Sequence, residues 1–92
     1  MSIKVLIFDN NEFLADLYQQ NLRVYANCDC IVASDLKDAY LQIQKDQTIQ
    51  ALVVKEYIGD TAAAKLMINF IKKNAKELPV IVFQGEKLAE QY

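Results

Sequence analysis

The feature that most constrains the fold of this sequence is an alternation of four short apolar runs with three longer amphipathic segments. The runs occupy residues 5–8, 30–33, 51–54 and 80–83. They are rich in Val and Ile and continuous rather than alternating, which is typical of strands buried on both faces of a parallel sheet. Pro79 precedes the last run, and the first position of a strand tolerates proline.

The segments between the runs have the apolar spacing of helices that bury one face. The first helix is expected to begin after Asn10 or Asn11 and the second after Ser34 or Asp35, since these residues are good N-caps. The third is expected after residues 59–61. The expected buried positions are Leu14, Leu17, Tyr18, Leu22 and Tyr25, then Leu36, Ala39, Tyr40 and Ile43, then Ala64, Met67, Ile68 and Ile71.

The third helix is more apolar than one buried face requires. Asp60 is expected to open it, and the lysines at positions 72, 73 and 76 to close it, as the helix dipole favours. A second apolar stripe is formed by Ala63, Leu66 and Phe70. This stripe indicates either a helix buried deeply in its own domain or a surface on which a partner docks.

The order of elements is therefore β-α-β-α-β-α-β, followed by a further expected helical turn over residues 86–92. Such alternation predicts an α/β fold: an open parallel sheet with right-handed crossovers and helices on both faces. With 92 residues and no linker, repeat or low-complexity segment, the chain is expected to form one domain over residues 1–92.

Composition excludes several functions. Ten Lys and Arg against twelve Asp and Glu do not favour a nucleic-acid partner, and no apolar run approaches the ~18–20 residues of a membrane span. Cys28 and Cys30 would share one face of a strand, where a mutual disulfide is strained. The chain has no His and no third Cys, so we expect buried reduced thiols, no metal site and a cytoplasmic location.

Polar residues follow the predicted strands at the edge where open parallel sheets carry their chemistry. They are found in residues 9–11, 55–57 and 84–85. These segments contain no His that could act as a base, no Gly-rich phosphate loop and no nucleophile motif. The sequence therefore does not predict an enzyme.

Three segments resemble response-regulator receiver domains of the CheY-like family. Residues 4–11, KVLIFDNN, resemble the first strand of that family with its acidic pair. Residues 33–39, ASDLKDA, resemble the junction of the second strand and second helix, and residues 78–85, LPVIVFQG, resemble the fourth strand. The resemblance covers almost the whole chain and implies the strand order 2-1-3-4, without the family's fifth βα unit.

The resemblance also implies a site, and this chain departs from it. Receivers hold a divalent metal with the acidic pair, phosphorylate an Asp after the third strand, and read the phosphate with a Thr or Ser and a Lys. Here Asp9 matches the first acid, while Asn10 replaces the second. Either Lys55 or Glu56 stands at the acceptor position, and Gln84 replaces the hydroxyl. The family's Lys has no counterpart. Because Asn10 removes one of the anionic groups that hold Mg²⁺ in the family, no cofactor is expected.

The resulting functional prediction is a phosphorylation-independent pseudo-receiver that acts in signalling through protein contacts. Without a fifth strand the fourth becomes an apolar edge, which is a template for association. The unit would then form a homodimer, dock a partner, or be the N-terminal part of a longer chain. The expected interface residues are Leu66, Phe70, Val80, Val82 and Phe83.

Two other interpretations remain at this point. Lys55 and the amides of Asn10, Asn11 and Gln84 would suit a sensor of a small anion or nucleotide at the strand ends. The simplest interpretation is that these are polar residues ending strands, with an Asp9–Lys55 ion pair that is partly exposed and contributes little.

Overall fold

The computed structural model describes residues 3–74 and 77–83 and contains seven elements in the predicted order. The expected helical turn over residues 86–92 and the residue Lys76 lie outside this part of the chain. The strands and helices are β1 Ile3–Phe8, α1 Glu12–Ala26, β2 Cys28–Ala33, α2 Leu36–Lys45, β3 Ala51–Lys55, α3 Ala63–Lys73 and β4 Val80–Phe83.

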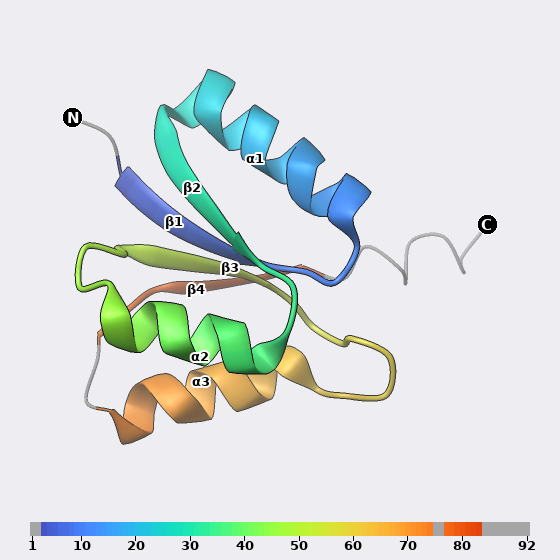
Figure 1. Cartoon of the computed structure of the whole chain (residues 1–92), viewed down its shortest axis with the longest axis vertical. Coiled ribbons are helices and arrows are strands. Elements are labelled where there is room, and N and C mark those ends of the chain that lie inside the picture. The colour runs from blue at the N-terminus through green and yellow to red at the C-terminus, as the bar shows by residue number, and fades with distance from the viewer. Residues whose placement is uncertain (1–2, 75–76, 84–92) are drawn as a thin grey trace.

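The four strands form one parallel sheet in the order β2-β1-β3-β4. Helix α1 covers one face, and α2 and α3 lie together on the other (Figure 1). The predicted α/β class, the strand order 2-1-3-4 and the placement of helices on both faces are therefore confirmed. The central strands β1 and β3 are buried on both faces, which explains their continuous apolar runs.

The sheet separates two apolar cores. The larger lies under α2 and α3 and is built on Leu6, Phe8, Leu52 and Val54 of the central strands. The alternate strand residues face α1 and form the smaller core, as the two-residue period of a strand requires. Its buried members are Val5, Ile7, Ala15, Cys28, Cys30 and Val53.

The helix ends show which of the proposed caps is used. The side chain of Asn11 accepts from the backbone N–H of Leu14 at 3.1 Å, and that of Asp35 accepts from the N–H of Asp38 at 2.7 Å. Helix α1 ends at Asn27, whose φ of 52° lies in the left-handed region that asparagine tolerates better than most residues. This cap turns the chain directly into β2.

The third helix begins after residues 59–61, as predicted, but the prediction that Asp60 opens it was wrong. Helix α3 begins at Ala63, its N-cap is Ala62, and no side chain caps it. Asp60 lies instead in a tight turn closed by an antiparallel bridge between Ile58 and Thr61, so it is not in the first helical turn. A local turn that satisfies its own backbone groups therefore replaces the expected cap. The last turn does carry Lys72 and Lys73, as predicted.

The predicted buried face of the first helix was partly wrong. Leu17 and Tyr25 are exposed, and the fully buried residue of α1 is Ala15. Leu14, Tyr18 and Leu22 are half-buried, with Tyr18 and Leu22 packed against the smaller core. Helix α1 thus has apolar side chains on two opposite faces, and only one of them meets the sheet.

Cys28 and Cys30 are buried, unbridged and on the same face of β2, as predicted. Burial, followed by the neighbouring Cys28, raises the pKa of the Cys30 thiol. Across residues 3–74 and 77–83, no helix is long and apolar enough to cross a membrane.

Candidate functional site

Asp9 and Lys55 meet at the carboxyl ends of the two central strands. Strands β1 and β3 pair in register up to Phe8 and Val54. The next residues in line are Asp9 and Lys55, so the register itself sets these two side chains opposite each other. Strand alternation places both on the face that α1 covers.

The pair is buried. The Lys55 Nζ lies 3.8 Å from the Asp9 Oδ1, and the two side chains are 6% and 0% exposed. That distance exceeds the usual 2.7–3.2 Å of an N–H···O hydrogen bond, so this contact is an ionic attraction in a poorly hydrated place. The pair is thus more buried than the sequence suggested.

The two carboxylate oxygens of Asp9 differ in their surroundings. Its Oδ1 accepts from the backbone N–H of Asn11 at 2.9 Å, which fixes the turn into α1. Its Oδ2 is buried and has no hydrogen-bond partner among the described residues. Burial of this oxygen is unfavourable, because its hydrogen bonds to water are lost and no protein donor replaces them. A nearby positive charge is therefore needed to offset the cost.

Tyr18 and Phe83 lie beside the ion pair on the α1 face. Their ring centroids are 4.7 Å apart with an interplanar angle of 58°, and Phe83 is the register partner of Lys55. Burial is the main cause that raises the pKa of Tyr18; the Asp9 carboxylate raises it further and the Lys55 ammonium opposes. The pKa of the Tyr18 phenol therefore depends on the charges of both Asp9 and Lys55.

The other predicted pocket residues have different surroundings. Asn10 is exposed, and the side chain of Asn11 is used as the cap of α1. Glu56 follows β3 in the turn, where its N–H donates to the carbonyl of Phe83 at 2.9 Å and its carbonyl accepts from Ala64 at 3.3 Å. Gln84 lies outside the described residues.

These residues do not fit the divalent metal that a receiver fold implies. Mg²⁺ requires several hard oxygen ligands and is usually bound by more than one anionic group. Here one carboxylate is available, and an ammonium group lies 3.8 Å from it. Within the described ranges, no three His, Cys, Asp or Glu side chains gather in a way that would hold a metal ion. We therefore derive no metal chemistry for this site.

The structure places the five predicted interface residues in three separate surroundings. Phe70 stacks on Tyr40 of α2 with ring centroids 4.2 Å apart, so much of its surface is used inside the domain. Leu66, one turn earlier, is exposed. Phe83 lies on the opposite face of the sheet against Tyr18.

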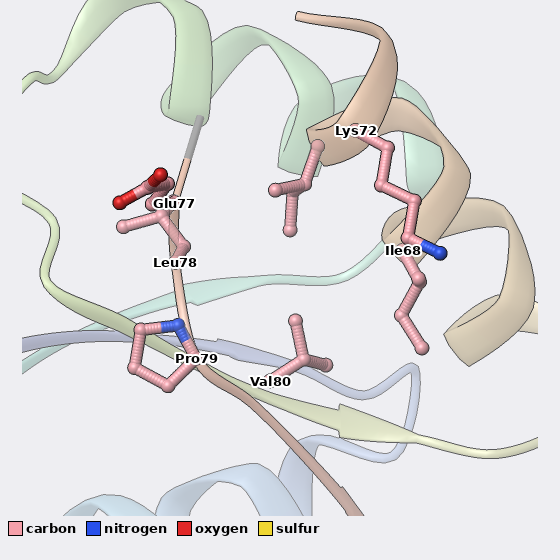
Figure 2. Close-up of a pocket in the computed structure, with 7 residues that line it drawn as sticks. Ile68, Lys72, Glu77, Leu78, Pro79 and Val80 are labelled. Atoms are coloured by element: carbon pink, nitrogen blue, oxygen red, sulfur yellow. The ribbon is translucent and has the colours of Figure 1, made fainter. Parts of the chain in front are cut away.

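The remaining two residues, Val80 and Val82, lie on the α3 side of the edge strand. Val80 lines an open groove of about 430 Å³ between the C-terminal half of α3 and the segment that leads into β4. In Figure 2, Ile68 and Lys72 of α3 face Leu78, Pro79 and Val80 across this groove. Leu66 precedes Ile68 by two residues, about 200° around the helix, so it lies away from the groove.

Sequence reasoning missed the role of Tyr18. It counted this residue among the core positions of the first helix, which is correct for the ring. The sequence contains no local signal for the proximity of Tyr18 to the ion pair, because Tyr18, Lys55 and Phe83 belong to three elements that are far apart in the sequence. Only the strand order, which places β4 beside β3, brings them together.

The architecture defines a class, the CheY-like receiver fold without its last βα unit. Comparison with solved structures agrees. The chain is similar to the signal receiver domain of a protein assigned as a Luxo repressor from Vibrio parahaemolyticus, with a TM-score of 0.76 and 21% identity over 89% of this chain. It is similar to a response regulator receiver protein from Pseudomonas putida, with a TM-score of 0.70 and 15% identity over 97% of this chain and 76% of that one.

A third similar structure is the receiver domain of the response regulator Ssk1 from Saccharomyces cerevisiae, solved together with the histidine phosphotransfer protein Ypd1. The TM-score is 0.63 and the identity 20% over 88% of this chain. The chain spans 61% of the length of the Vibrio and yeast structures. No family model and no curated protein matches it. At these identities the comparisons show the receiver fold.

Proposed function

We propose that this chain is a non-catalytic signalling module with a receiver fold that acts through protein contacts and without phosphorylation. The observation that carries the proposal is the Lys55 ammonium 3.8 Å from the Asp9 carboxylate. We assign Lys55, rather than Glu56, to the position of the phosphorylated aspartate, because it ends β3 in register with Asp9.

The chemistry of the pair supports this assignment. An ammonium group cannot form the acyl phosphate that an aspartate forms. Its fixed positive charge beside Asp9 also opposes the binding of a second cation in the same place. The site is closed further by Tyr18 and Phe83, which leave the pair nearly inaccessible. Among the described residues at this end of the sheet, a phosphodonor would therefore find no aspartate at the acceptor position and no cluster of ligands for a metal ion.

Incubation with acetyl phosphate and Mg²⁺, followed by intact mass spectrometry, tests the proposal. No addition of a phosphoryl group is expected, while a receiver with an unaltered aspartate, treated in the same tube, should be modified. A matched Lys55→Arg variant should also stay unmodified, since it keeps the charge. Covalent phosphate on any residue of the wild-type chain would overturn the proposal.

The contacts of the module are proposed to involve the edge of the sheet beside α3. Val82 is exposed at this edge, and Val80 lines the groove beside it. The groove is apolar but is flanked by Lys72 and Glu77, a combination that suits a protein surface. The Ssk1 receiver was solved with a protein bound to it, which supports a protein rather than a small molecule as the partner here.

The competing proposal of an anion or nucleotide sensor is less well supported. Lys55, the cation it requires, is buried and lies against Asp9. Asn11 is used as a helix cap, and Asn10 is exposed whereas the ion pair is buried. These residues therefore do not converge on a ligand.

A further inference from the structure

The outer surface of α1 carries an apolar stripe that nothing in the described part of the chain covers. Phe13, Leu17 and Val24 are 75%, 43% and 73% exposed. At 100° per residue they fall within about 40° of one another, opposite the buried Ala15. Figure 1 shows α1 alone on its side of the sheet, with its outward face turned away from every other element.

The stripe is unusual for a helix that packs on a sheet. Such a helix normally has charged and polar residues on its outer face, whereas α1 has apolar residues there as well as toward the sheet. Isolated exposed apolar residues need no explanation, but three on one helical face, at positions i, i+4 and i+11, indicate a contact surface. This surface is separate from the α3–β4 groove, which lies on the other side of the sheet.

Charges beside the stripe indicate what covers it. Asp16 and Arg23 lie on the same flank of the stripe, separated along the helix by two turns. Both side chains are exposed. Within the described residues, neither forms a salt bridge. If a second α1 lies antiparallel across the stripe, a two-fold axis midway between Asp16 and Arg23 sets each aspartate beside the arginine of the other copy. A parallel two-fold pair would instead set the two charged flanks on opposite sides of the contact, where neither charge meets a partner.

The same axis makes the apolar residues interdigitate. It crosses the helix between Gln19 and Gln20, so Val24 of the second copy falls between Phe13 and Leu17 of the first. The two Gln20 side chains meet at the axis. Each Nε2 donates one hydrogen to Asp16 Oδ2 at 3.0 Å, and its second hydrogen can bond to the amide oxygen of the other copy. The stripe is thus self-complementary in shape and in charge, as a two-fold interface requires.

We infer that a second copy of this chain covers the outer face of α1, forming an antiparallel helix pair that interdigitates Phe13, Leu17 and Val24 and joins Asp16 to Arg23 twice. The apolar residues supply most of the affinity, and the exposed ion pairs chiefly fix the antiparallel orientation. This inference concerns a surface other than the one in the proposed function. It therefore stands or falls independently of the phosphodonor experiment.

Sedimentation equilibrium of the 92-residue chain over a wide concentration range tests the inference. The wild type should show a monomer–dimer equilibrium. Phe13→Glu should raise the dissociation constant by about 100-fold, since it places a charge against the apolar side chains of the second copy at both ends of the contact. Leu41→Glu is the control, because Leu41 is also apolar and more than half exposed but lies on α2, and this variant should leave the dissociation constant unchanged. Circular dichroism should show all variants folded, as these positions are exposed.

Charge reversal tests the orientation. Asp16→Arg and Arg23→Asp should each weaken the dimer, and the two together should restore it to within about twofold of wild type, since the pairs are re-formed with opposite sign. A chain that stays monomeric overturns the inference. So does a dimer that Phe13→Glu leaves intact, a dimer that Val82→Glu alone disrupts, or a double reversal that fails to restore association.

Discussion

The ring of Tyr18, on α1, packs against the ring of Phe83, at the end of β4, with the two centroids 4.7 Å apart. This contact joins helix α1 to the edge strand beside the buried ion pair. The contact spans the α1 face of the sheet at the level of Lys55, the register partner of Phe83. The two rings therefore shield the charged pair from water. Because Tyr18 lies beside both charges, its pKa can be used to test this arrangement.

The ionisation of Tyr18 should report the charges beneath it. Its pKa is raised by burial first and by the Asp9 carboxylate second, while Lys55 lowers it. Asp9→Asn should therefore lower the Tyr18 pKa, and Lys55→Met should raise it further. Carbon-13 NMR titration of the tyrosine rings measures this. Tyr40, whose pKa is raised by burial alone, is the internal control and should not change. Equal shifts in both rings would contradict the geometry.

Breaking the buried pair should be costly. Lys55→Met leaves the Asp9 carboxylate buried with an unpartnered oxygen, so the free energy of unfolding should fall by about 3–5 kcal/mol. Asp9→Asn with Lys55→Met removes both charges and should recover much of this loss. Urea denaturation of the two single variants and the double variant measures the coupling. Additive effects would show that the two groups do not interact.

Acid should weaken the contact between Lys4 and Asp46. Hydrogen bonds from Lys4 and Thr48 lower the pKa of Asp46 below its ordinary value of 3.8. A carboxyl with a depressed pKa in the folded state stabilises the protein above its unfolded pKa, and this contribution is lost as the pH falls through and below about 4. The stability difference between wild type and Asp46→Asn should therefore be largest near neutrality and shrink in acid. Denaturation at a series of pH values measures it, and Lys4→Met should mimic the variant.

Phe70 should prove to be a structural residue and Leu66 a dispensable one. The Phe70 ring stacks on Tyr40 at 4.2 Å, so Phe70→Ala should lower the free energy of unfolding by about 2 kcal/mol. Leu66→Ala, one turn earlier and exposed, should cost less than about 1 kcal/mol. Thermal denaturation compares the two. A larger loss for Leu66→Ala would show that the stacked pair does little for stability.

The order and class of the elements were predictable because each apolar run is short, continuous and ends at a polar residue, while the segments between the runs have helical spacing. The role of Asp60 before α3 was not predictable, since residues 59–61 have the composition of a helix cap, and only the bridge between Ile58 and Thr61 reveals a separate turn. In α1 the apolar residues lie on both faces, so periodicity alone could not choose between Leu17, which is exposed, and Ala15, which is buried.

The residues of the site were predictable from the sequence, but the burial of their side chains was not. The resemblance selected Asp9 and left Lys55 and Glu56 as alternatives, because counting along a loop cannot resolve one residue. A charged residue is expected to be exposed unless it is paired. The burial of Lys55 depends on the register of β1 with β3 and on rings contributed by α1 and β4, which no local pattern encodes.

The positive charge beside Asp9 is covalently part of the chain. It therefore cannot be removed by a chelator, diluted by a change in cellular magnesium, or lost by hydrolysis with a characteristic lifetime. Under the proposed function, the module would hold one setting for as long as it stays folded. The strength of its signal would then follow from how many copies are synthesised and degraded.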